Sequence, residues 1–241
     1  MTEISLLDML KAGIHFGHQK ARWHPKMKPF IFTSKNGISI INLEKTAEKL
    51  KQAVDFVKKL SQEGKVVLFV GTKRQAQEII KKYAGEAGMP YVINRWLGGT
   101  FTNFSMIQKI INKFKDLKEK KKTGELEKYT KRERMLMDEE IERLDKLVGG
   151  IETLDKIPGA IYMVDIKQER TALREAKRMN LPVVAMIDTN ASPEGIKYPI
   201  PANDDATKSI ELITKTIAEA IKDGKKEKTE KKEKPKEENI K

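Results

Sequence analysis

The chain has 241 residues, with 48 Lys and Arg against 35 Asp and Glu, and a formal net charge of +13. This length suits one large domain or two smaller ones, and the excess positive charge makes a polyanion such as nucleic acid the first partner to consider. The absence of cysteine excludes disulfides and thiolate metal sites. Neither a signal-peptide pattern nor an apolar run of about 20 residues occurs, which predicts a cytoplasmic protein without a membrane partner.

The amino-terminal part of the chain combines positive charge, aromatic rings and turn residues. Residues 4–12 have the apolar spacing of a short helix, and residues 15–29 are expected to form a loop because Gly and Pro interrupt them. No Asp or Glu occurs between Met9 and Leu43. Cations replace phosphate counterions and rings such as Phe16 stack on unpaired bases, so this stretch predicts an RNA-binding surface. Its candidate residues are Lys11, His15, His18, Lys20, Arg22, Trp23, His24, Lys26, Lys28 and Lys35.

Strands and helices alternate after this segment. Residues 30–32 and 38–41 are predicted as short strands around an Asn36-Gly37 turn. A helix over 43–60 precedes a strand at 66–70, a helix from Thr72 that Gly85 and Gly88 end, and a strand at 90–93. The same order recurs with a strand at 161–164, a helix at 168–180 and a strand at 181–187. Two βαβ units with fully apolar strands predict an α/β fold, with a flavodoxin- or Rossmann-like parallel sheet flanked by helices.

Residues 103–148 form a charged, proline-free insertion between the two units. Two apolar stripes at helical spacing, joined by a polar linker, predict antiparallel helices that project from the sheet domain and pair as a coiled coil. The insertion holds 13 basic and 10 acidic residues, which suits contact with both RNA and protein.

The remaining carboxy-terminal part is expected to be simpler. Residues 188–206 contain three prolines and are predicted as a long loop, followed by a helix over 207–221. The expected domains are therefore an α/β domain of residues 1–102 with 149–222, a helical hairpin of residues 103–148, and a disordered charged tail of residues 223–241.

Three other kinds of site have weaker support in the sequence. The Gly71–Arg74 turn lies between a strand and a helix, but neither a P-loop nor a dinucleotide-binding motif occurs, so Lys73 and Arg74 are candidates for RNA phosphate contacts instead. Arg95, in a glycine-rich stretch, is a further RNA candidate.

The three histidines are loosely spaced as metal ligands that Asp8 or Asp188 could join, yet no metal or other cofactor is predicted. Strand-end acids suit turn capping better than catalysis, so no catalytic residue is predicted among Asp165, Asp188, Asp204 and Asp205.

Several long segments resemble the sequential motifs of the bacterial small-subunit ribosomal protein two family. They are AGIHFGHQKARWHPKMKPFIF, NGISIINLEKT, FVGTKRQAQ, NRWLGGTFTNF, PGAIYMVDIKQERTALREAKRMNLPVVAMIDTN and YPIPANDDATKSI. They occur in order between Ala12 and Ile210, and the resemblance extends over nearly everything from Leu6 to Ile221. The resemblance implies a parallel α/β domain with a protruding helical hairpin, and a structural role in the ribosome without catalysis. It also implies contacts with small-subunit ribosomal RNA and with neighbouring small-subunit proteins, including ribosomal protein one, and no small-molecule substrate.

Two rival functions remain open from the sequence. A nucleotide-binding enzyme could use the same α/β scaffold, and a free RNA chaperone or messenger-binding protein could use the same basic segment. A ribosome-associated protein of this kind is expected to make about six to ten contacts between Lys or Arg and phosphate.

Overall fold

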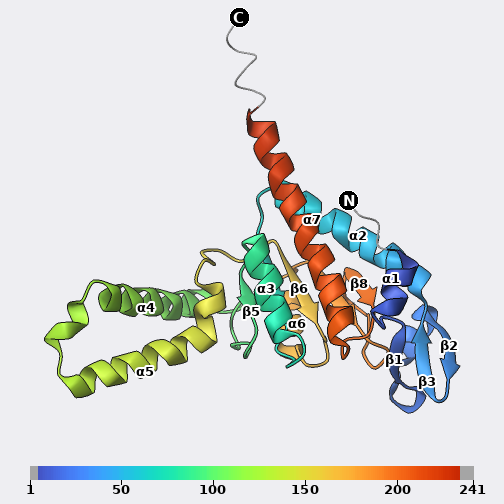
Figure 1. Cartoon of the computed structure of the whole chain (residues 1–241), viewed down its shortest axis with the longest axis horizontal. Helices are drawn as coiled ribbons and strands as arrows, with labels where there is room; N and C mark the ends of the chain where they lie inside the picture. The colour runs from blue at the N-terminus through green and yellow to red at the C-terminus, as the bar shows by residue number, and fades with distance from the viewer. Residues whose placement is uncertain (1–4, 234–241) are drawn as a thin grey trace, which may run out of the picture.

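The computed structural model describes residues 5–233, with only the backbone for residues 229–233. Its centre is a five-stranded parallel sheet in the order β5-β4-β6-β7-β8 (Figure 1). The strands are β4 (Val67–Val70), β5 (Tyr91–Val92), β6 (Ala160–Val164), β7 (Val183–Ile187) and β8 (Tyr198–Pro201). Both predicted βαβ units are present, as the parallel pairs β4–β5 and β6–β7.

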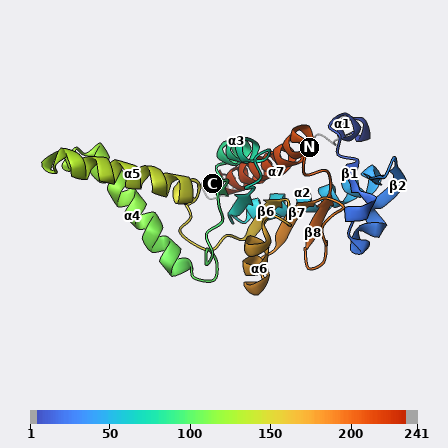
Figure 2. The same ribbon diagram turned by 90° about the horizontal axis from the view of Figure 1, so that it is seen from below.

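Helices cover both faces of this sheet, which explains its continuous apolar strands. Phe69 and Tyr162 pack in a core shared with α2 (Leu43–Gln62), α3 (Gln77–Ala87) and α7 (Thr207–Glu233). The alternate residues Leu68 and Ile161 pack in a second core, which contains α6 (Arg170–Arg178) and the base of the hairpin (Figure 2). Because successive strand side chains point to opposite faces, every strand position faces an apolar layer.

Strand β8 corrects the prediction of a loop over residues 188–206. Pro199 pairs with Ala185 and Pro201 with Ile187 along β7. A proline cannot donate a ladder hydrogen bond, so it fits a strand only where that donor is not needed. Strand β8 lies at the edge of the sheet, with β7 as its single neighbour, and its prolines are tolerated there.

Helix α7 is longer than predicted. The sequence places its end at Ile221 and a disordered tail from 223, whereas the helix continues to Glu233. Gly224 lies against α2 so closely that a Cβ at this position would be only 2.5 Å from the carbonyl oxygen of Lys58. The Ser61 hydroxyl donates to the Ile221 carbonyl at 2.8 Å, and Lys58 forms an ion pair with Glu227. Contacts with α2 thus stabilise the part of α7 beyond Ile221, which has too few apolar residues to be predicted as a helix. Residues 234–241 of the expected tail lie outside the described part of the chain.

The amino-terminal lobe (residues 15–41) is a small antiparallel sheet in the order β1-β3-β2. It follows the predicted helix, which is α1 (Leu6–Lys11), and consists of β1 (Phe16–Gln19), two 3₁₀ turns at Lys20–Arg22 (η1) and Pro25–Phe30 (η2), β2 (Ile31–Lys35) and β3 (Ile38–Ile41). The β2–β3 hairpin is confirmed: Asn36 and Gly37 both have positive φ, at 51° and 76°, as its tight turn requires. The prediction of a loop over residues 15–29 was wrong for β1. This strand forms by pairing with β3, and a local sequence pattern does not show a pairing between separate segments.

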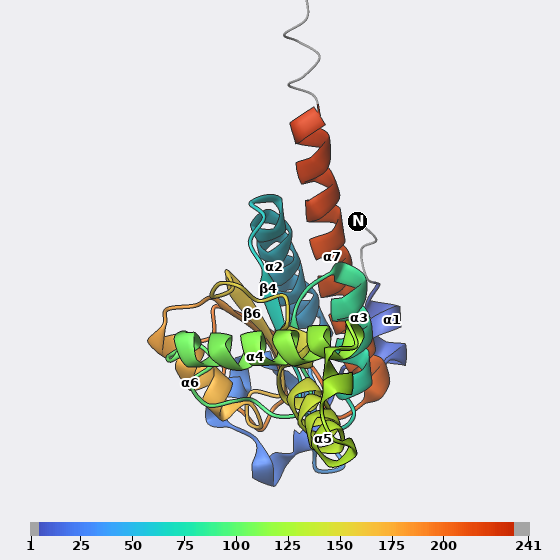
Figure 3. The same ribbon diagram turned by 90° about the vertical axis from the view of Figure 1, so that its left-hand side faces the viewer.

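The insertion is a helical hairpin that projects from the sheet domain (Figures 1 and 3). It consists of α4 (Phe104–Lys122), a 3₁₀ turn at Glu125–Lys128 and α5 (Lys131–Val148). Ile107, Ile111 and Phe114 of α4 share the second core with Leu144 and Val148 of α5. Nearer the tip, Leu126 is buried but the Met135 and Leu136 side chains are exposed, so most of the buried apolar residues lie in the half of the hairpin next to the sheet. Within the described residues, no helix is long and apolar enough to cross a membrane.

A glycine lets the lobe approach the end of β7. A Cβ on Gly17 would lie 2.6 Å from the Thr189 methyl carbon and 3.0 Å from the Ser39 carbonyl oxygen. The lobe and the sheet are also joined there by the His18 N–H, which donates to the Thr189 hydroxyl at 2.8 Å, and by the His24 N–H, which donates to the Thr189 carbonyl at 2.7 Å.

Gly17→Ala should therefore destabilise the protein by about 1–3 kcal/mol, the usual cost of overpacking. The measurement is urea denaturation, with Gly85→Ala as the matched control, since a Cβ at Gly85 of α3 meets nothing within 4 Å. Alanine in a helix should be neutral or stabilising there. Equal stability of Gly17→Ala and wild type would refute the close contact with Thr189.

Candidate nucleic-acid interface

The cations of the amino-terminal lobe and of α1 are displayed on short, anchored elements. Lys20 and Arg22 lie on η1, Lys28 on η2 and Lys35 on β2. Met27 is fully buried and anchors η2 in the second core, while the His24 ring accepts the Lys26 N–H at 3.2 Å and caps that turn. These anchors hold an irregular backbone in one shape and leave its cationic side chains in solvent.

The predicted cations divide into unpaired and paired groups. In the described part of the chain, seven of them are exposed with side chains free of any hydrogen bond or ion pair: Lys11, Lys20, Arg22, Lys28, Lys35, Arg74 and Arg95. Lys26 instead forms an ion pair with Glu194. An unpaired, exposed cation loses no internal partner when it binds a phosphate, so these seven suit RNA better than Lys26 does.

Lys73 is held inside the protein and does not suit RNA. Its side chain is only 13% exposed, and its ammonium lies 2.7 Å from Asp204, 2.6 Å from Asp205 and 3.4 Å from Asp165. Burial alone would lower the pKa of Lys73, but the Asp204 and Asp205 carboxylates outweigh it and raise that pKa. Burial raises the pKa of Asp204 to about 7, with repulsion from Asp165 and Asp188 adding to it.

The three histidines have different surroundings. The His18 Nδ1 lies 3.0 Å from the buried Asp188 carboxylate, and this hydrogen bond raises the pKa of His18. Burial lowers the pKa of His15, whose ring lies tilted against Phe16 with centroids 4.0 Å apart. His24 caps η2 as described above, so all three rings have contacts within the protein. Trp23 beside them is half-buried.

Aromatic exposure is greatest on the small sheet. Phe32 on β2 is 74% exposed, and Phe16 on β1 is also exposed. Such rings are available to stack on unpaired bases. Sequence analysis favoured Phe16 and Trp23 for this role, and Phe32 lies in the same acid-free stretch; only the structure shows that Phe32 has the more exposed ring.

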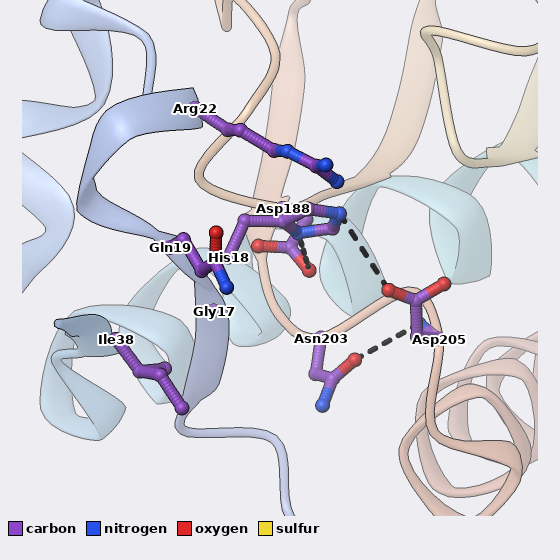
Figure 4. Close-up of a pocket in the computed structure, with 8 residues that line it drawn as sticks. All are labelled: Gly17, His18, Gln19, Arg22, Ile38, Asp188, Asn203 and Asp205. Atoms are coloured by element: carbon purple, nitrogen blue, oxygen red, sulfur yellow. Dashed lines mark hydrogen bonds and ion pairs between the residues drawn. The ribbon is translucent and has the colours of Figure 1, made fainter. Parts of the chain in front are cut away.

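A pocket of about 310 Å³ lies where the lobe meets the carboxyl ends of β7 and β8, with His18 between Asp188 and Asp205 (Figure 4). Ligand atoms of these three residues lie within 4.8 Å of one another, a spacing that a divalent cation could bridge. His15 and His24 do not join this group. Asp205 also forms an ion pair with Lys73, and His18 is hydrogen-bonded to Asp188, so both residues already have partners within the protein. That no metal is bound here stays a prediction.

The backbone of the turn after β4 does not offer a binding site for a nucleotide phosphate. The N–H and hydroxyl of Thr72 both donate to the buried Glu169 carboxylate, at 2.8 and 2.6 Å. Burial raises the pKa of Glu169, partly offset by these bonds. Helix α3 begins at Gln77 and not at Thr72 as predicted, because residues 72–76 form this turn. An internal carboxylate thus occupies the donors that a nucleotide phosphate would need.

The glycine-rich loop that carries Arg95 is organised by one buried carboxylate. Glu175 of α6 is 7% exposed, and its two oxygens accept the Trp96 indole N–H at 3.0 Å, the Gly99 N–H at 2.8 Å and the Phe101 N–H at 2.9 Å. Trp96 is buried and stacks edge-on against Phe101. Burial would raise the pKa of Glu175, but these donors outweigh it and lower that pKa. Glu175 thereby sets the path of the chain into α4, a role that sequence analysis missed.

Glu175→Gln should destabilise the protein by about 3 kcal/mol, because an amide cannot accept all of these hydrogen bonds. The folded-state pKa is depressed, so the stabilisation is present above the pKa of an unfolded glutamate and is lost as pH falls through the folded pKa. The stability difference between wild type and Glu175→Gln, measured by urea denaturation, should therefore shrink in acid. Glu219→Gln, on the exposed side of α7, is the control and should change stability by less than about 0.5 kcal/mol. A stability difference between wild type and Glu175→Gln that did not change with pH would contradict an ionised Glu175 in the folded protein.

Comparison with known proteins identifies the family. The family model described as ribosomal protein S2 matches residues 9–224, which include the lobe, the sheet and the hairpin. A protein of Coprothermobacter proteolyticus named "Small ribosomal subunit protein uS2" is 52% identical over 224 residues, which cover 93% of this chain and 84% of that relative. The resemblance seen in the sequence motifs is thereby confirmed. The chain belongs to the ribosomal protein S2 family and is a ribosomal protein, not an enzyme.

Proposed function

We propose that this chain is a structural constituent of the small ribosomal subunit and binds small-subunit ribosomal RNA through its amino-terminal lobe and α1. The observation that carries this proposal is the set of exposed cations without internal partners. The relative from Coprothermobacter proteolyticus is named as a small-subunit protein, which agrees with it. The proposed partners are ribosomal RNA and neighbouring small-subunit proteins, including ribosomal protein one, with no small-molecule substrate.

The thirteen residues predicted from the sequence divide into three proposed roles. Seven form phosphate contacts, namely Lys11, Lys20, Arg22, Lys28, Lys35, Arg74 and Arg95. Trp23 and His15 remain candidates for contact with bases. His18, His24, Lys26 and Lys73 support the binding surface from within, through the partners described above.

RNA shape, not base sequence, is the proposed basis of recognition. The seven cations come from six separate elements or loops, so they do not follow a single helix or strand. Contacts of this kind read the backbone path and the 2′-hydroxyls of folded RNA. The sheet beneath them provides a rigid platform, since it is buried on both faces.

Replacing Lys20, Arg22, Lys28 and Lys35 together with Ala should weaken binding to small-subunit ribosomal RNA and reduce its dependence on salt. Each lost phosphate contact lowers the slope of log K against log salt by about 0.7 to 0.9, so the slope should fall by about 3 to 4. The measurement is filter binding over a range of salt concentrations.

The matched control removes the same charge from exposed lysines elsewhere, Lys51, Lys59, Lys81 and Lys167. It should change the salt slope much less. Equal loss in both quadruple variants would mean that net charge, not the lobe, determines binding.

The hairpin is proposed to be a coiled coil that contributes a second contact with the subunit. Ion pairs connect its helices, between Lys113 and Glu140 at 2.8 Å and between Lys121 and Asp138 at 2.7 Å. Its near balance of basic and acidic residues fits a contact with both RNA and protein.

Deleting residues 119–138 and closing the gap with a short glycine linker removes the tip but keeps Ile107, Ile111 and Leu144 in the second core. The variant should fold with a thermal midpoint close to that of wild type, yet associate less with small subunits on a density gradient. Undiminished association would show that the hairpin tip contributes nothing to binding.

A further inference from the structure

A groove beside α7 has no lining residue in common with the pocket at His18. Helices α1 and α3 flank the amino-terminal half of α7, one on each side (Figures 1 and 2). The groove between them has a volume of about 340 Å³ and is lined by residues of all three helices. Its floor includes Ala12, the Tyr83 ring and Leu212, and its rim carries Lys11, Lys208 and Lys215.

The rim is positively charged and largely free to bind. Lys11 and Lys208 have no hydrogen bond or ion pair within the described residues, and Lys215 has only a long contact of 3.9 Å with Glu219. Among the described residues that line the groove, Glu211 is the acidic one, and it is engaged by the Tyr83 hydroxyl at 2.8 Å and by Lys82 at 3.8 Å. The groove therefore presents cations around an apolar floor, with its own carboxylate already occupied.

Helix α1 extends the apolar surface beyond the groove. Met9 is its buried residue, whereas Leu7 is 67% and Leu10 49% exposed. Leu7 lies one helical turn before Lys11, so the two share a face and Leu7 continues the groove away from α7. Exposed leucines on so short a helix mark a surface that another apolar surface can cover.

We infer that this groove, together with Leu7 and Leu10, is a docking site for an acidic amphipathic helix of another protein. The apolar stripe of such a helix would cover Leu7, Leu212 and the Tyr83 ring, and its carboxylates would meet the lysines of the rim. This arrangement, an apolar centre with a charged rim, is the usual anatomy of a helix-in-groove interface. An RNA backbone would use the lysines but would gain nothing from the exposed leucines, so the apolar residues favour a protein. The site shares only Lys11 with the proposed RNA-binding surface and does not depend on it.

Photo-crosslinking in assembled small subunits tests the class of partner. A photoreactive amino acid is placed at position 7 or 212 of the full chain, with position 179 on the exposed end of α6 as a control. The expected result is a crosslink from positions 7 and 212 to one acidic protein segment with helical apolar spacing, absent from position 179. Crosslinks to ribosomal RNA, or to no partner, would overturn the inference.

Peptide binding tests the chemistry of the groove. The probe is a synthetic labelled helix with leucine at i, i+3, i+4 and i+7 and glutamate at the flanking positions, measured with the full chain by fluorescence anisotropy. Leu7→Ser and the double variant Lys208→Glu, Lys215→Glu should each weaken binding at least tenfold. A matched peptide with glutamine in place of glutamate should also bind at least tenfold more weakly.

The control variant for this measurement is Met106→Ser, at an exposed apolar position on the hairpin, which should bind like wild type. All substituted side chains are exposed or at the rim, and circular dichroism is to be used to check that each variant is folded. Equal binding of the two peptides, or no effect of Leu7→Ser, would refute the proposed site.

Discussion

The position of the amino-terminal lobe depends on a buried junction at the end of β7. Asp188 is almost fully buried and accepts a hydrogen bond from the His18 ring at 3.0 Å, while Thr189 accepts the His18 N–H through its hydroxyl. A small three-stranded sheet has little core of its own and needs packing to be stable. Gly17 permits the lobe to approach the end of β7 closely, and the Asp188–His18 contact sets the orientation of the lobe. The orientation of the exposed cations of the lobe therefore depends on buried groups at the end of β7, chiefly Asp188 and Thr189.

The side chains at the carboxyl ends of the parallel strands bind one another and not an external ligand. In many open α/β sheets this edge holds a ligand. Here Lys73 forms ion pairs with Asp165 and Asp204 at this edge, and Glu169 accepts hydrogen bonds from the amide and hydroxyl of Thr72 in the turn after β4. Charges that sequence analysis assigned to an RNA or nucleotide site thus stabilise the scaffold. The residues proposed to bind partners lie instead on the lobe, on α1 and on the hairpin.

One buried carboxylate organises the connection to the hairpin. Glu175 binds donors from the loop between β5 and α4, and Trp96 and Phe101 pack around it in the second core. Because the base of the hairpin shares that core, the direction of α4 follows from α6 and the sheet. The hairpin is consequently an extension of the α/β domain at its base and a separate projection at its tip.

The sequence by itself determined the elements whose signal is local: the two βαβ units, the Asn36-Gly37 hairpin, the helical insertion and the acid-free basic stretch. Only the tertiary structure decided which cations remain free, because Lys73, Lys26 and His18 pair with acids more than a hundred residues away. It likewise decided β1, β8 and the extension of α7, whose own residues carry turn or low-complexity signals. Each of these is stabilised by a neighbouring strand or helix, and such long-range contacts leave no periodic pattern in the chain.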